Sequence, residues 1–195
     1  DTLPAAIERY GATVCFTAPT SYRVIAMGLS NGGANGGPKP DLRTLRKCVS
    51  AGEALPAATR KLWRVATGIE LIDGIGSTEM LHIFISADEA HARPGATGLA
   101  VPGYRACILD EAGRPLPPGQ VGRLAVKGPT GCKYLADERQ QQYVQNGWNL
   151  TGDAYLVDTD GQYVYQARTD DMIISGGYNI AGPEVESALL LHPAV

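Results

Sequence analysis

The run from Asp73 to Glu79, DGIGSTE, carries residue types that are well suited to ligand chemistry. It directly follows a short apolar segment that ends at Ile72. Glycines let a backbone approach a ligand closely, and the hydroxyls and the carboxylate can then face that ligand. Taken alone, the run equally fits a glycine-rich turn with a capping Thr78 and a solvated Glu79.

Five further motifs accompany this run in a fixed order along the chain. They are SAGEALP from Ser50, LTGD from Leu150, ARTDD from Ala167, ISGGYN from Ile174 and PEVE from Pro183. Glycine-rich turns and Thr-Gly-Asp triplets are individually common, so the information lies in the ordered set.

A second glycine-rich segment, Gly28 to Pro40, superficially resembles a phosphate-binding loop that ends at Lys39. It lacks a hydroxyl residue near the lysine that would complete such a site. A surface loop is the better interpretation.

Cysteine and histidine usage favours neither a disulfide framework nor a metal centre. The four cysteines are far apart, form no Cys-x-x-Cys pair and fit free thiols in a reducing cytoplasm. The three histidines lack the spacing that places several metal ligands on one helix face, so we expect no protein-bound transition metal. These residues are Cys15, Cys48, Cys107, Cys132, His82, His91 and His192.

Alternating helical and strand patterns in the first half predict a βαβ sheet. We expect helices at 3–10, 21–27 and 57–67, a buried strand at 13–17 and short strands at 45–50 and 70–72. In an open parallel sheet, the loops after such strands are where ligands bind.

From about Pro94 the pattern changes to frequent Gly and Pro with short apolar runs, which predicts a small antiparallel β region. These runs cover 106–109, 123–126, 155–157 and 163–165. After Arg168 we expect a new unit with a strand pair over 172–180 and a helix that starts at Pro183.

Composition favours a small-molecule partner. The chain has 195 residues with 17 Lys+Arg against 20 Asp+Glu, a net charge of -3 and no basic run, which argues against a nucleic-acid-binding module. No segment approaches the roughly 20 apolar residues of a membrane span, and no targeting signal is visible. The motifs carry no information on the oligomeric state.

The ordered motifs resemble those of the adenylate-forming superfamily, which contains acyl-CoA synthetases, luciferases and peptide-synthetase adenylation domains. The run from Asp73 to Ser86 is especially similar to benzoate-CoA and 2-aminobenzoate-CoA ligases. The resemblance implies an α/β plus β fold in several parts. These are a partial βα-layered sheet subdomain at 1–93, a small distorted β-barrel subdomain at 94–167, a hinge at 168–170 and the start of an α+β C-terminal domain at 171–195.

The resemblance also implies an ATP-dependent acid:CoA ligase that acts on an aromatic carboxylic acid. In this family the carboxylate attacks the α-phosphate of MgATP, pyrophosphate leaves, and the thiol of CoA then displaces AMP. Two alternatives stay open: an adenylating enzyme with another acid specificity, and a non-catalytic nucleotide-binding module. Five retained residues argue against the module, because binding AMP alone needs neither a Mg²⁺ carboxylate nor a hinge. They are Thr78, Glu79, Asp153, Arg168 and Asp170.

Carried over residue by residue, the resemblance makes Glu79 the Mg²⁺-associated carboxylate and Thr78 the hydroxyl on the α-phosphate. Asp153 is similar to the family's clamp on the ribose hydroxyls, and Arg168 to its second ribose contact. The adenine site would be formed by Gly52, Glu53, Ala54, Asp73, Gly74, Ile75 and Gly76. The family usually has an aromatic residue where this chain has Ile75.

Further positions follow from the same resemblance. Asp170 falls at the domain hinge, and Gly177 at the pantetheine tunnel of CoA or, compatibly, in a hairpin turn. The acid pocket would take the segment from Ala18 to Tyr22 together with His82 and Ile83. For Tyr22 and His82, ordinary core packing is the alternative.

Two elements of the family pattern have no counterpart in the 195 residues: the phosphate loop that ends in Pro-Lys-Gly and the late catalytic lysine. We therefore expect this stretch to be a fragment that holds the adenosine half of the site and is inactive alone.

Overall fold

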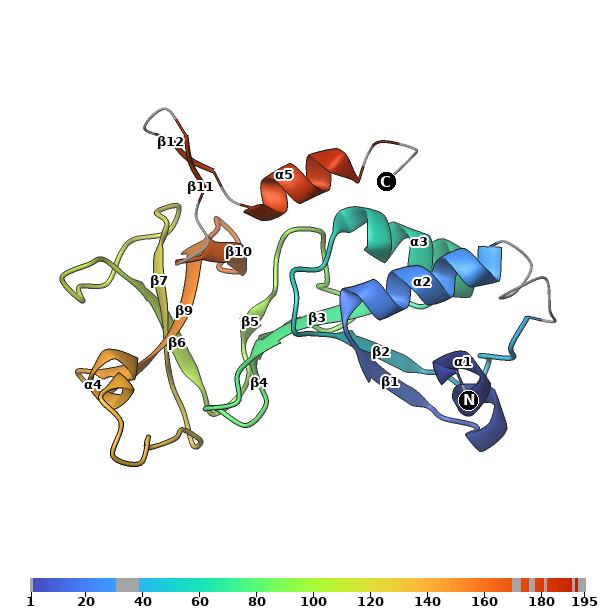
Figure 1. The fold of residues 1–195 in the computed structure, drawn as a ribbon, viewed down its shortest axis with the longest axis horizontal. Helices are drawn as coiled ribbons and strands as arrows, with labels where there is room; N and C mark the ends of the chain where they lie inside the picture. The colour runs from blue at the N-terminus through green and yellow to red at the C-terminus, as the bar shows by residue number, and fades with distance from the viewer. Residues whose placement is uncertain are drawn as a thin grey trace.

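The computed structural model describes residues 2–30, 39–169, 173–175, 178–180, 182–190 and 192. Two β-sheets lie next to each other, and a short hairpin and helix α5 lie along one side of both (Figure 1). The Asp170 and Gly177 predictions and residues 31–38 of the glycine-rich segment lie outside the described residues.

The first sheet is mixed. Its order is β1 (Val14–Thr17), β2 (Lys47–Ser50), β3 (Leu71–Gly76), β4 (Ile83–Ser86) and β5 (Leu99–Ala100). The first three strands are parallel, which confirms the βαβ expectation, whereas β3, β4 and β5 pair antiparallel. Strand β4 had no counterpart among the expected strands.

Three helices pack with this sheet: α1 (Leu3–Tyr10), α2 (Pro19–Ser30) and α3 (Ala57–Thr67). Their bounds confirm the expected helices, and α2 is longer than expected at both ends. Helices α2 and α3 lie side by side over one face of the sheet (Figure 1). Local signals end two of the helices, since Gly11 after α1 and Gly68 after α3 take the left-handed conformation. The core beneath them contains Cys15, Tyr22, Cys48, Trp63 and Leu71.

Strand β3 continues to Gly76, so Asp73 to Gly76 is extended strand and the turn begins only after it. The two glycines allow β4 to approach. A Cβ at Gly74 would lie 2.6 Å from Ile83 Cδ1, and one at Gly76 would lie 2.5 Å from the backbone oxygen of His82. The glycines that suggested a turn therefore make a tightly paired hairpin possible.

The second sheet is antiparallel throughout, which confirms the expected β region. Its order is β10 (Tyr163–Arg168), β9 (Trp148–Val157), β7 (Gly122–Lys127) and β6 (Arg105–Leu109), and β8 (Val144–Gln145) pairs with β9. A short helix, α4 (Arg139–Tyr143), precedes β8.

A second core joins the two sheets. Met80 and Phe84 from the β3–β4 hairpin pack with Leu124, Val126 and Tyr155 from the second sheet. Strand β5 extends the first sheet beyond the boundary expected at residue 93, because it pairs with β4. The β3–β4 hairpin thus belongs to the first sheet by strand pairing and to the second core by its packing.

The last described part consists of β11 (Ile173–Ser175), β12 (Tyr178–Ile180) and α5 (Gly182–Leu189). This matches the strand pair and helix expected after Arg168. Among the described helices, none has the length and apolar character needed to cross a membrane.

Candidate active site

A cavity of about 960 Å³ lies between the two sheets. Residues from the loop after β2, the β3–β4 hairpin and strands β9 and β10 line it. The lining includes Glu79, predicted to bind Mg²⁺, and every residue predicted to contact the nucleotide. The nucleotide residues are Gly52, Glu53, Ala54, Asp73, Gly74, Ile75, Gly76, Thr78, Asp153 and Arg168. The fold thus gathers motifs from distant parts of the sequence around one space.

The loop after β2 forms one wall. Gly52 has a φ of 94°, a backbone conformation that glycine adopts without strain. The Glu53 carboxylate accepts a 2.7 Å hydrogen bond from the Thr20 hydroxyl at the start of α2. This bond fixes the loop against the first helical layer.

Asp73 lies on β3, paired in register with Ser50 of β2. Burial raises the pKa of Asp73 to about 6, although the positive charge of Arg60 and the N–H of Gly74 oppose the shift. Arg60 also lines the cavity and pairs with Glu70 at 2.8 Å. Burial therefore makes this carboxyl group in the cavity easier to protonate than an exposed aspartate.

The turn after β3 carries Thr78 and Glu79. Met80 N–H donates to the Ser77 carbonyl at 3.2 Å and Leu81 N–H to the Thr78 carbonyl at 3.2 Å. Leu81 has a φ of 69°, and Met80 is fully buried in the second core. The buried methionine anchors the turn, so both predicted catalytic side chains project from a fixed backbone.

Glu79 receives a 2.5 Å hydrogen bond from the hydroxyl of Tyr134. This bond is the main reason that the pKa of Glu79 lies below its usual value. An ionised carboxylate is the kind of oxygen ligand that Mg²⁺ prefers. No group of three or more His, Cys, Asp and Glu side chains that could hold a metal exists among the described residues. Glu79 by itself would supply one carboxylate ligand, which suits Mg²⁺ because that ion usually keeps several waters.

Asp153 and Arg168 are direct partners across the β9–β10 pair. Arg168 Nη1 lies 3.3 Å from Asp153 Oδ1 and 3.2 Å from the Thr151 carbonyl oxygen. Asp153 is 9% exposed. Gly152, between Thr151 and Asp153, has a φ of 78°, and a Cβ there would lie 2.9 Å from Arg168 Nη2. The LTGD motif therefore sets the strand geometry that brings the Asp153 carboxylate and the Arg168 guanidinium together.

Several lining residues had not been singled out from the sequence. They are Arg60, Thr97, Thr151, Tyr155, Tyr165 and Gln166. The Tyr155 and Tyr165 rings meet edge-on, with centroids 5.4 Å apart. Thr151 and Gln166 lie within or beside quoted motifs, which could have indicated them, whereas Arg60 and Thr97 carry no local signal.

The structure separates the residues proposed for the acid pocket. Tyr22 is fully buried in the first core, donates to the carbonyls of Cys15 and Val49, and meets Trp63 edge-on. These are the contacts of core packing, and Tyr22 lines neither described cavity.

His82 lies instead with Phe16, with ring centroids 5.5 Å apart. Cys15 faces the helices whereas Phe16 is 53% exposed, because successive strand residues point to opposite faces of the sheet. His82 is thus on the outer side of β1, away from Tyr22, whereas Ile83 of β4 lies against Gly74 of β3. Ala18 is half-buried between β1 and α2.

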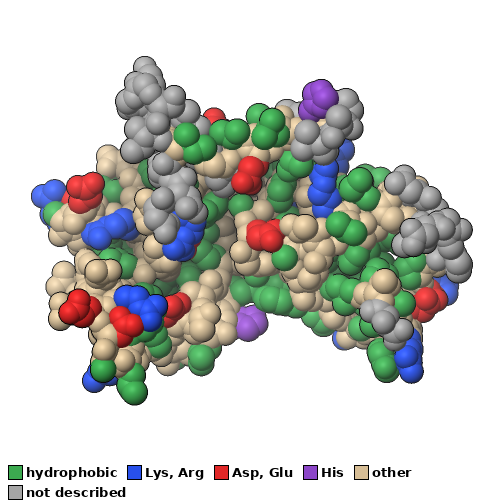
Figure 2. All heavy atoms as spheres, in the orientation of Figure 1, with side chains coloured by type: hydrophobic (Ala, Val, Ile, Leu, Met, Phe, Trp, Pro, Cys, Tyr) green, Lys and Arg blue, Asp and Glu red, His purple; other side chains and the backbone are tan. Residues whose placement is uncertain are grey.

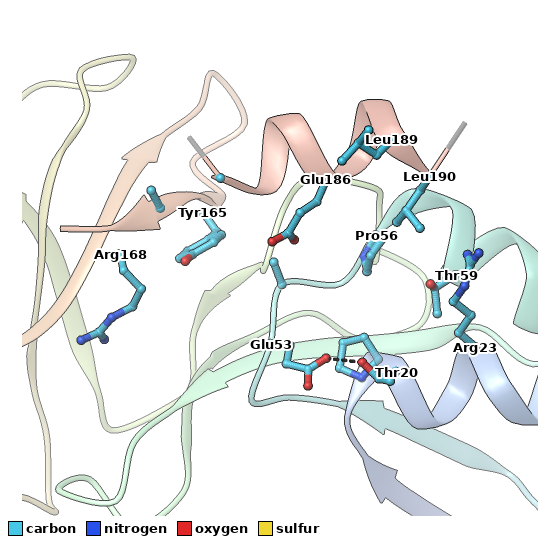
Figure 3. A pocket seen from close by; sticks show the side chains of 14 residues that line it. Thr20, Arg23, Glu53, Pro56, Thr59, Tyr165, Arg168, Glu186, Leu189 and Leu190 are labelled. Carbon is cyan, nitrogen blue, oxygen red and sulfur yellow. Dashed lines mark hydrogen bonds between the residues drawn. The ribbon is translucent and has the colours of Figure 1, made fainter. Parts of the chain in front are cut away.

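A second cavity of about 570 Å³ opens between α5 and the loop after β2. In Figure 3, Glu186 extends from α5 into this space, and Glu53 and Thr20 lie below it. Both cavities share Glu53, Tyr165 and Arg168. The second cavity is therefore an extension of the first.

The surface in Figure 2 carries Lys and Arg side chains interspersed with Asp and Glu over the part that contains the second sheet. Hydrophobic side chains, drawn in green, are exposed on both parts of this face. On this face, the described residues present charges of both signs close to one another.

The arrangement of a mixed sheet beside an antiparallel sheet matches the N-terminal domain of adenylate-forming enzymes. Residues 1–135 match the family described as AMP-binding enzyme, and the chain belongs to that family.

Among curated relatives, the chain is 39% identical to benzoate–CoA ligase of Thauera aromatica over 98% of this chain and 37% of that protein. It is 34% identical to the mitochondrial acyl-coenzyme A synthetase ACSM4 of Homo sapiens over 100% of this chain and 34% of that protein. The chain thus spans about a third of the length of these relatives.

Solved structures agree with this assignment. An anthranilate CoA ligase, AuaEII, in complex with anthranoyl-AMP superposes with a TM-score of 0.90 at 40% identity, over 99% of this chain and 36% of that chain. A benzoate CoA ligase from Burkholderia xenovorans LB400 gives a TM-score of 0.81 at 37% identity, over 96% and 37% of the two chains.

Proposed function

We propose that the protein containing this chain is an AMP-forming acid:CoA ligase that activates an aromatic acid such as benzoate or 2-aminobenzoate. The observation that carries the proposal is the gathering of Thr78, Glu79, Asp153 and Arg168 around one cavity. The relatives named as benzoate and anthranilate CoA ligases support the choice of acid.

In this proposal the cavity binds the adenosine half of ATP. The Gly52 loop and Asp73 meet adenine, and the Asp153 carboxylate accepts hydrogen bonds from the ribose hydroxyls. Arg168 orients Asp153 and contributes a second ribose contact. The Thr78 hydroxyl donates to the α-phosphate, where negative charge builds up during attack by the substrate carboxylate.

Glu79 would hold Mg²⁺, which offsets charge on the phosphates when bound. The chain's own contribution is to keep this carboxylate ionised and in place through Tyr134. CoA would enter for the second half-reaction, with Asp170 as the hinge and Gly177 at the thiol tunnel.

The acid pocket is proposed at the outer side of β1, where Phe16 and His82 meet and Ile83 packs under Gly74. An aromatic ring could stack there on an exposed aromatic side chain. Tyr22 is left out of this proposal because it belongs to the first core.

A reducing compartment such as the cytoplasm is proposed on the basis of the cysteines. All four carry free thiols, and Cys15 and Cys48 are buried.

Substitution of Asp153 tests the nucleotide site. In the intact protein, Asp153→Ala should weaken ATP use by roughly 1.5 to 3 kcal/mol because a charge-assisted hydrogen bond is lost. The ribose is common to every reaction, so the preference among benzoate, 2-aminobenzoate and a short aliphatic acid should stay the same. The measurement is the KM for ATP and the acid selectivity in pyrophosphate exchange. A shift in acid selectivity with an unchanged KM for ATP would assign Asp153 to a different ligand.

A further inference from the structure

Tyr134 lies between β7 and α4, far along the sequence from the turn that carries Glu79. Its hydroxyl nevertheless donates to Glu79 Oε1 at 2.5 Å. The bond engages one of the two carboxylate oxygens and restricts rotation of that carboxylate. None of the sequence motifs pointed to this tyrosine.

Contacts from α4 hold Tyr134 in place. Its backbone N–H donates to Gln140 Oε1 at 2.8 Å. The Tyr143 ring meets its ring edge-on at 5.7 Å between centroids, and the Arg139 guanidinium lies 4.6 Å from the ring centroid. Two neighbours contact the ring and a third holds the backbone, so the hydroxyl is presented at a defined place.

The segment 130–134 also contacts the turn that carries Thr78 and Glu79 at a second point. Thr130 Oγ1 donates to the Met80 carbonyl at 2.8 Å and lies 2.6 Å from the hydroxyl of Tyr104. Residues 130–134 therefore attach to the turn through its backbone at Met80 and through its side chain at Glu79.

We propose that Tyr134 is a positioning residue that orients the Glu79 carboxylate toward a Mg²⁺ ion brought in by the nucleotide. The inference rests on the proposed function, because it needs Glu79 to bind that ion. A partner that donates to a metal-ligating carboxylate fixes its orientation and supports metal affinity.

The test measures binding, so it does not depend on turnover. In the intact protein, calorimetry gives the Kd of ATP with excess Mg²⁺ and with EDTA, and the Kd of AMP with EDTA. Tyr134→Phe should weaken MgATP binding roughly tenfold through loss of a charge-assisted bond. Binding of AMP without metal should change less than about twofold, since AMP needs no Mg²⁺ contact.

Three variants complete the experiment. Glu79→Gln removes the carboxylate and defines the full loss of the Mg²⁺ effect. Gln140→Ala frees the Tyr134 backbone and should give a smaller loss in the same direction. Tyr163→Phe is the matched control, because it deletes a tyrosine hydroxyl that donates to the Ala106 carbonyl at 2.6 Å. Tyr163 lines neither cavity.

The outcomes separate the two proposals. If Glu79→Gln abolishes the Mg²⁺ effect while Tyr134→Phe and Gln140→Ala bind MgATP like the wild type, the role of Tyr134 is overturned and the proposed function stands. If the wild type binds neither AMP nor MgATP, both fail together. A selective loss of MgATP affinity in Tyr134→Phe, with Tyr163→Phe unchanged, supports the inference.

Discussion

Asp73 is a residue whose ionisation depends on its place in the fold. Its pKa is raised from 3.8 to about 6 by burial. The folded protein therefore binds a proton there more tightly than the unfolded chain does. Well above pH 6 the carboxylate is charged in both states, and the folded state bears the full desolvation cost. As pH falls from about 6 toward 3.8, this cost disappears and the free energy of unfolding rises.

Replacing Asp73 by Asn should remove that cost. At pH 7 we expect Asp73→Asn to raise the free energy of unfolding by at most about 3 kcal/mol, and the difference should shrink as pH is lowered to 4. Urea unfolding at several pH values measures it. A difference that is the same at pH 4 and pH 7 would contradict the raised pKa.

Asp110 provides a control, because its pKa is shifted in the opposite direction to that of Asp73. The backbone and side chain of Arg114 hold the pKa of Asp110 below its usual value. Its stabilising effect is present above the unfolded pKa and is lost as pH falls through the folded pKa. Asp110→Asn should therefore lower stability at pH 7, with a difference that vanishes in acid.

At the scale of elements, the β3–β4 hairpin determines where Thr78 and Glu79 lie. Gly76→Ala should disturb it, because the added Cβ would lie 2.5 Å from the His82 backbone oxygen. We expect a loss of about 1 to 3 kcal/mol in stability, together with weaker AMP and MgATP binding as the turn shifts. Thermal unfolding and calorimetry of the intact variant check both effects.

Gly28 on α2 is the matched control. A Cβ there meets nothing within 4 Å, so Gly28→Ala should be neutral or stabilise the helix by about 0.5 to 1 kcal/mol. Wild-type behaviour of Gly76→Ala would mean that the close approach of β4 is not needed for the site.

At the scale of the whole molecule, the cavity is formed by both sheets, which share a core through the hairpin. The chain spans about a third of the length of its relatives, and by the family resemblance it lacks the phosphate loop and the late lysine. We predict that the isolated 195-residue polypeptide gives no ATP-pyrophosphate exchange with benzoate or 2-aminobenzoate, whereas the intact protein does. Circular dichroism on the same sample verifies that the polypeptide is folded. Exchange at the rate of the intact protein would show that the missing groups are dispensable.

The sequence alone predicted the family and most elements, and it supplied the set of residues proposed here to bind the nucleotide. The bounds of α1 and α3 were found because helix ends depend on nearby residues such as Gly11 and Gly68. The motif residues could be assigned because a shared site needs particular residue types in a fixed order. All of those assigned to the nucleotide line one cavity.

Only the tertiary structure decided the rest, since it depends on which surfaces meet. DGIG is strand because β4 packs against its glycines. Tyr22 is a core residue because it lies on the side of α2 that faces β1. The Tyr134–Glu79 bond joins residues 55 positions apart. Local patterns report only neighbours a few positions away along the chain, whereas such a contact exists only once two sheets have packed around a common core.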